Sequence, residues 1–107
     1  MKKEKGRTIS IVDWSRFNEI PSKWHDLFLS LANKASSYDG YSPDASQIVL
    51  LSVASKTVLK ECGWETKDPM YKGLKVLTEC GALKKVSRGV YRINSDIVMK
   101  GDILIRY

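Results

Sequence analysis

Hydrophobic side chains recur every three or four positions in the first half of the chain, most regularly between residues 24 and 35. This spacing places them on one face of an α-helix, so it predicts a buried helix that follows Ser22. Residues 36–46 are rich in serine, glycine and aspartate, which favours a loop. The expected buried face of the helix consists of Trp24, Leu27, Phe28, Leu31, Ala32 and Ala35.

Ahead of that helix, the loose alternation of residues 8–12 predicts a short strand. Asp13 can cap a short helix after it, and Pro21 ends that helix. The helix would place apolar side chains on one side, and the spacing of the tryptophans is that of core anchors. The side chains concerned are Trp14, Phe17 and Ile20 in this helix, with Trp24 and Trp64 further along.

Residues 47–53 form a short apolar run that fits either a buried strand or a helix end, because periodicity does not separate the two. Ser52 or Ser55 can cap the helix that follows, and Gly63 ends it. Its expected inner side consists of Val58, Leu59 and Cys62.

A further helix is expected from Thr66, its cap, to Cys80, with Pro69 in the first turn and Gly81 at the end. Gly73 in its interior costs about 1 kcal/mol relative to alanine. Close packing against the preceding helix or DNA would explain this glycine, and so would simple tolerance. The buried face repeats at Met70, Leu74, Leu77 and Cys80, which turns Lys67, Asp68, Tyr71, Lys72 and Lys75 outward.

Directly behind this helix the chain predicts a basic β-hairpin. Residues 82–86 and 90–93 are rich in strand-forming side chains, and the turn 87–89 contains Gly89, which can adopt the positive φ of a tight hairpin. Arg88 lies at the tip, flanked by Lys84, Lys85 and Arg92. Two helices joined by a three- or four-residue turn and followed by a basic hairpin are typical of a winged helix-turn-helix. The sequence therefore predicts an α+β winged helix-turn-helix with an additional N-terminal helix.

Charge is distributed unevenly along the 107 residues, whose formal net charge is +6. Lysine and arginine outnumber acids by four to one in residues 1–7 and by nine to four in residues 56–92, whereas acids exceed bases by five to three in residues 8–55. We therefore expect a basic flexible arm over residues 1–7 and one winged-helix domain over residues 8–107. A cationic surface on a small domain favours a polyanion, most commonly nucleic acid.

Other classes of function find less support. An apolar run long enough to cross a membrane is absent, and the basic N-terminus lacks the apolar stretch of a signal peptide, so we expect a cytoplasmic protein. Cys62 and Cys80 lie far apart and are expected as buried thiols; with His25 as the single histidine, they support neither a metal site nor a cofactor. No catalytic triad, phosphate loop or carboxylate pair is evident. We expect a non-enzyme.

Candidate DNA-binding residues follow from this charge pattern. A lysine can contact phosphate or the acceptor atoms of guanine, and a tyrosine can contact phosphate or a thymine methyl group. Asp68 fits the positive N-terminal end of its helix better than a cytosine contact. The candidates are Lys67, Tyr71, Lys72 and Lys75 on the helix, Lys84, Lys85, Arg88 and Arg92 on the hairpin, and Lys2, Lys3, Lys5 and Arg7 in the arm.

Residues 53–102 resemble the winged-helix plasmid replication proteins of the RepL type from Gram-positive bacteria. The resemblance rests on residues 56–63 (KTVLKECG), residues 74–81 (LKVLTECG) and, most specifically, residues 88–94 (RGVYRIN) followed by residues 99–102 (MKGD). It implies a winged-helix fold and sequence-specific binding of double-stranded DNA in plasmid or phage replication or maintenance.

The sequence leaves two other functions open: a transcriptional regulator of a mobile element, and a winged helix that binds protein without DNA. We also expect a homodimer, because one winged helix reads few base pairs. Leu29 and Tyr38, which lie outside the main buried stripe, are the residues that suggest an interface.

Overall fold

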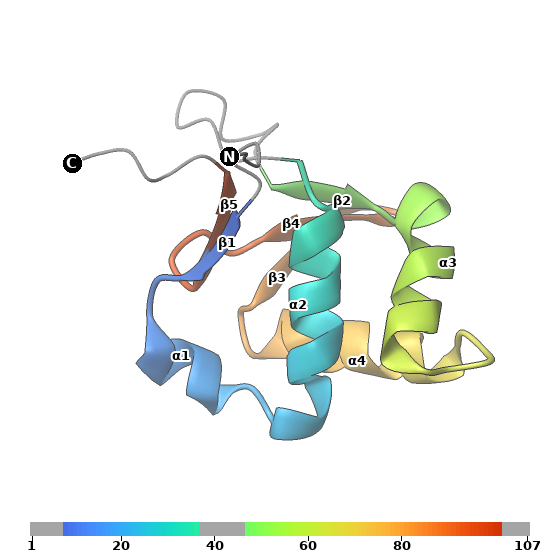
Figure 1. Ribbon diagram of the computed structural model, residues 1–107, viewed down its shortest axis with the longest axis horizontal. Coiled ribbons are helices and arrows are strands. Elements are labelled where there is room, and N and C mark those ends of the chain that lie inside the picture. The colour runs from blue at the N-terminus through green and yellow to red at the C-terminus, as the bar shows by residue number, and fades with distance from the viewer. Residues whose placement is uncertain (1–7, 37–46, 102–107) are drawn as a thin grey trace, which may run out of the picture.

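The computed structural model describes residues 8–36 and 47–101, in which four α-helices and one 3-10 helix combine with two antiparallel sheets in an α+β fold (Figure 1). The first half contains β1 (Thr8–Ile11), α1 (Trp14–Glu19), η1 (Ser22–Trp24) and α2 (His25–Lys34). The second half contains β2 (Ile48–Leu50), α3 (Leu51–Cys62), α4 (Asp68–Glu79), β3 (Leu83–Ser87), β4 (Val90–Ile93) and β5 (Val98–Gly101).

The larger sheet has the strand order β2-β4-β3, and the smaller sheet pairs β1 with β5. The predicted hairpin is confirmed as β3 and β4, with Gly89 at φ 73° in the turn. An irregularity between Lys85 and Ser87 shifts the register near the tip. The apolar run 47–53, which fitted either a strand or a helix end, contains both: β2 passes directly into α3.

Helix α2 is the centre of the core, as its regular apolar repeat predicted. In Figure 1 it stands between α1 and α3, with α4 crossing beneath. All six side chains of the predicted face are buried. They belong to one buried cluster with side chains of α3, α4, β2, β4 and β5, among them Val58, Met70, Leu74, Leu77, Val49, Ile93 and Val98.

Gly73 allows α4 to pack closely against η1 and α2. A Cβ atom at this position would collide with Leu27 and would lie 2.7 Å from Cε3 of Trp24. The close neighbour is therefore the segment η1–α2, neither of the two that the sequence suggested.

Gln47 joins the two sheets. Its side-chain amide donates to the carbonyls of Ile93 (3.3 Å) and Val98 (3.0 Å), and its side-chain oxygen accepts from the Lys100 amide at 2.6 Å. The residue is 1% exposed and has φ 55°, in the left-handed region that non-glycine residues seldom adopt.

Helix starts differ from the sequence-based expectation. Ser52 and Ser55 lie inside α3, which begins at Leu51, because the first amide of the helix is already satisfied by the Gly89 carbonyl at 2.9 Å. Helix α4 begins at Asp68, after the five-residue connection 63–67 that follows α3, so Thr66 is not its cap. Pro69 lies in the first turn as predicted, and its missing N–H leaves one donor fewer to cap.

Two expected core positions are wrong. Trp14 is 60% exposed, because the short α1 turns Phe17 inward and the Trp14 ring covers Phe17 only edge-on, with ring centroids 5.7 Å apart. Cys80 is exposed because it follows the last residue of α4, where the helical repeat has ended. Cys62 and Trp64 are half-buried.

Candidate nucleic-acid interface

Helix α4 separates into a buried face and a charged face. Met70, Leu74 and Leu77 are buried, as the sequence predicted. All four candidate contacts on this helix, Lys67, Tyr71, Lys72 and Lys75, are exposed. Since Asp68 and Glu79 are exposed on the same helix, its outer face mixes both signs of charge.

The hairpin presents its basic side chains on two different faces. Lys85 lies opposite Tyr91, whereas Lys84 lies opposite Arg92, and successive side chains of a strand alternate between faces. Leu83 and Ile93 are buried and share the face of Lys85 and Tyr91, so this is the side that meets the helices. Lys84 and Arg92 therefore project from the other side of the sheet.

A groove of about 510 Å³ lies where α3, α4 and the hairpin meet; we call it the basic groove. Leu51, Met70 and Tyr91 supply apolar surface within it. The polar and basic residues that line it are Ser52 and Ser55 of α3, Lys67 at the start of α4, Tyr71 of α4, and Lys85 and Arg88 of the hairpin.

The basic groove has the chemistry of a phosphate-binding surface. Three cationic side chains and four hydroxyl groups, including that of Tyr91, line it, and none of the described residues that line it carries a carboxylate. Lysine, arginine, serine and tyrosine side chains are the usual donors to phosphate oxygens. The absence of acids in the groove distinguishes it from the outer face of α4.

The other candidate residues lie elsewhere. Lys84 and Arg92 line a separate hollow of about 440 Å³, together with residues 81, 83 and 93–95. Lys72 and Lys75 do not line the basic groove. The arm residues Lys2, Lys3, Lys5 and Arg7 lie outside the described residues.

Ser52 and Ser55 are the groove residues that sequence reasoning missed as contacts, because both were expected to be helix caps. The available signal was their spacing: residues 52 and 55 are three positions apart, which places them on the same side once the helix begins at Leu51.

Metal-ligand clusters and membrane-spanning helices are absent from the described part of the chain. No group of three or more histidine, cysteine or acidic side chains there could hold a metal ion, and no helix among these residues is long and apolar enough to cross a membrane. Burial raises the pKa of the Cys62 thiol, and the nearby carboxylates of Asp26 and Glu61 act in the same direction. This thiol is therefore a poor source of a nucleophilic thiolate.

Comparison with protein families gives one match. The profile described as Firmicute plasmid replication protein (RepL) matches residues 49–106, more than half of the chain. The matched segment includes every candidate residue of α4 and the hairpin. Comparison with curated proteins gives no match, and neither does comparison with solved structures.

Proposed function

The chain belongs to the family of Firmicute plasmid replication proteins (RepL), and on that premise we propose that it binds duplex DNA sequence-specifically at an origin-like site. The observation that carries the proposal is the basic groove, which is cationic and free of carboxylates among its described lining residues. A protein that recognises a DNA site must hold the phosphate backbone beside the element that reads the bases. The groove adjoins α4, on which Tyr71, Lys72 and Lys75 are exposed.

In this proposal α3 and α4 form a helix-turn-helix, and the β3–β4 hairpin is its wing. Helix α4 enters the major groove, where Lys72 and Lys75 reach base edges or flanking phosphates. Lys67, Lys85 and Arg88 then clamp one stretch of backbone in the basic groove, and the Ser52 and Ser55 hydroxyls add uncharged donors. The contact between the Leu51 amide and the Gly89 carbonyl fixes the wing relative to the helices.

Two neighbouring lysines provide a matched test of the basic groove. We predict that Lys85→Ala weakens duplex binding and makes the slope of log affinity against log salt shallower by about one, since each phosphate neutralised contributes about 0.9. Lys84→Ala removes the same charge from the opposite face of the hairpin and leaves affinity and slope nearly unchanged. Fluorescence anisotropy at several salt concentrations measures both. Equal losses in the two variants would contradict the assignment of the groove as the phosphate site.

A second prediction distinguishes side chains that contact base edges from side chains that contact phosphates. Lys72→Ala or Lys75→Ala should weaken cognate binding more than random binding, by about 1–3 kcal/mol where a base edge is contacted. Arg88→Ala should instead weaken all duplexes alike, because the wing tip would contact phosphate. Fragments that the protein selects from its own replicon supply the cognate duplex. Replacing all three residues without loss of cognate affinity would rule out this surface.

A further inference from the structure

Strand β1 has one edge that no strand covers in the described part of the chain. It pairs with β5 in the register Ile11↔Val98, and Val12 donates its amide to the Ile97 carbonyl at 2.7 Å. Hydrogen-bonded pairs alternate along an antiparallel ladder, so the backbone N–H and C=O of Ser10 point toward β5. The N–H and C=O groups of Ile9 and Ile11 therefore point away from β5.

Gln47 provides an independent check of this orientation. Its side-chain N–H donates to the Val98 carbonyl, and its side-chain oxygen accepts from the Lys100 N–H, so these backbone groups of β5 face away from β1. Gln47 thus occupies the outer edge of β5 as a neighbouring strand would. Within residues 8–36 and 47–101, the uncovered edge of the small sheet is therefore that of β1.

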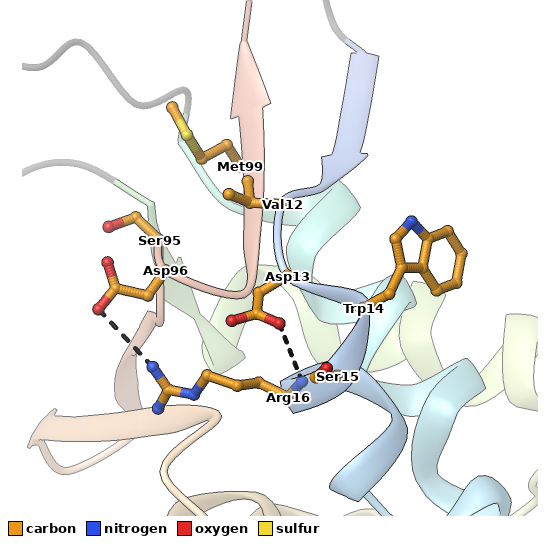
Figure 2. A pocket seen from close by; sticks show the side chains of 8 residues that line it. All are labelled: Val12, Asp13, Trp14, Ser15, Arg16, Ser95, Asp96 and Met99. Atoms are coloured by element: carbon orange, nitrogen blue, oxygen red, sulfur yellow. Dashed lines mark hydrogen bonds and ion pairs between the residues drawn. The ribbon is translucent and has the colours of Figure 1, made fainter.

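The edge lacks the usual protection against strand pairing. Natural edge strands are commonly guarded by charged residues or proline, but β1 has the sequence TISI. Next to it, Val12 and Trp14 are 52% and 60% exposed. Figure 2 shows the Trp14 ring on the side of β1 away from β5, pointing away from the cluster of Asp13, Arg16 and Asp96.

Charge favours a second copy of this chain as the occupant. The net charge of +6 comes from residues 1–7 and 56–92, whereas acids exceed bases in residues 8–55, which contain β1. The hollow beside β1, of about 770 Å³, is lined by Asp13 and Asp96 against the single cation Arg16. In Figure 1 this end of the molecule lies away from α3 and hence from the basic groove.

We propose that two copies of the chain pair antiparallel through β1, about a two-fold axis at Ser10. Ile9 of each copy then exchanges two backbone hydrogen bonds with Ile11 of the other, which produces a four-stranded sheet β5-β1-β1-β5. The Ile9 and Ile11 side chains stay against their own core. Both Ser10 side chains meet at the axis on the outer face, and Val12 and Trp14 flank the new strand pair. This pairing leaves the basic groove of each copy accessible.

Ser10 offers a direct test, because any substitution there faces its own counterpart across the axis. Ser10→Lys places two cations directly opposite each other, which is unfavourable in a strand pair, and should raise the dimer dissociation constant at least tenfold. Ser10→Thr should retain the dimer. Sedimentation equilibrium without DNA measures both, and circular dichroism verifies that both fold. A wild-type chain that is strictly monomeric at 100 µM, or a dimer unaffected by Ser10→Lys, would overturn the proposal.

A cross-link tests the register itself. Directly opposed residues of a non-hydrogen-bonded pair have Cα atoms about 4.5 Å apart, within disulfide range. In a Cys80→Ser background, Ser10→Cys should give a covalent dimer under mild oxidation. Thr8→Cys should not, since the two Thr8 positions would lie about 13 Å apart along the strands. Equal cross-linking of both variants would overturn the register. Neither measurement involves DNA, so failure of the dimer is distinguishable from failure of the proposed DNA binding.

Discussion

At Gly73 the missing side chain allows α4 to lie against Trp24 and Leu27. Alanine is the better helix former by about 1 kcal/mol, so an exposed glycine would be improved by the substitution. Here the added methyl group would meet the rigid Trp24 ring at 2.7 Å. We predict that Gly73→Ala destabilises the protein by about 1–3 kcal/mol, the usual cost of overpacking a core. Urea denaturation measures the change.

The control for Gly73→Ala is Thr57→Ala, at an exposed position of α3, which should be neutral or slightly stabilising. A stabilising effect at both positions would show that α4 has room to move away from α2. The sequence identified Gly73 as unusual but could not name its neighbour, because the contact depends on the crossing of two helices far apart in the chain.

The hairpin shows which part of the site could be predicted from the sequence and which part could not. The basic hairpin was predicted with its turn and its strands within one residue. The sequence did not predict which lysine faces the helices. Val86 and Val90 alternate onto the same face of the hairpin as Lys84, so their apolar side chains suggest that this face is buried, but Val86 is 49% exposed. The register irregularity near the tip adds to this ambiguity. The burial of Leu83 and Ile93 shows that Lys85 is on the side that meets the helices, and Lys85 lines the groove there.

Among the elements, α2 and α3 are linked by a polar cluster as well as by their core contacts. Glu61 of α3 accepts from the Ser30 hydroxyl at 2.6 Å and from Lys34 Nζ at 2.9 Å. The Ser30 bond, followed by that of Lys34, lowers the pKa of Glu61 below its usual value. The carboxylate form is therefore the one that the folded state prefers.

This pKa shift predicts a pH-dependent part of stability. A carboxyl group whose pKa is lowered on folding stabilises the protein above its unfolded pKa, and this stabilisation is lost as the pH falls through the folded pKa. We predict that Glu61→Gln lowers stability at pH 7, by less than about 1 kcal/mol because the group is largely exposed. Near pH 3 the difference from wild type should shrink. Thermal unfolding at both pH values measures this, with Glu79→Gln as the control; an equal loss at pH 3 would argue against the linkage.

Elements were predicted best where a periodic pattern was long. The apolar faces of α2 and α4 and the strands of the hairpin came from repeats that their own residues define. Helix starts were predicted poorly, since the first amide of α3 is satisfied by the Gly89 carbonyl, a partner 38 residues away that no local cap signal can reveal. The same bond explains why β2 runs into α3 without a loop.

For the molecule as a whole, the two sheets are held together by Gln47, which the sequence showed only as part of an apolar run. We predict that Gln47→Ala destabilises the protein by about 2–4 kcal/mol, because buried backbone groups of two strands lose their partners. Gln47→Gly should cost about 1 kcal/mol less, since glycine adopts the positive φ of this position without strain. Chemical denaturation compares the two variants. The reverse order would mean that the backbone at this position relaxes on substitution.

The Gln47 bridge also has a consequence for how the molecule opens. Strand β5 belongs to a two-stranded sheet, and amides that face solvent at the edge of such a small sheet would exchange at nearly the rate of a loop. The Lys100 N–H instead donates to the side-chain oxygen of Gln47, a buried residue that joins the two sheets. Its hydrogen exchange should therefore require the same large opening that releases the Ile93 amide, which bonds the Gln47 carbonyl at 2.9 Å. Strand β5 would then be among the slowest of the described segments to exchange.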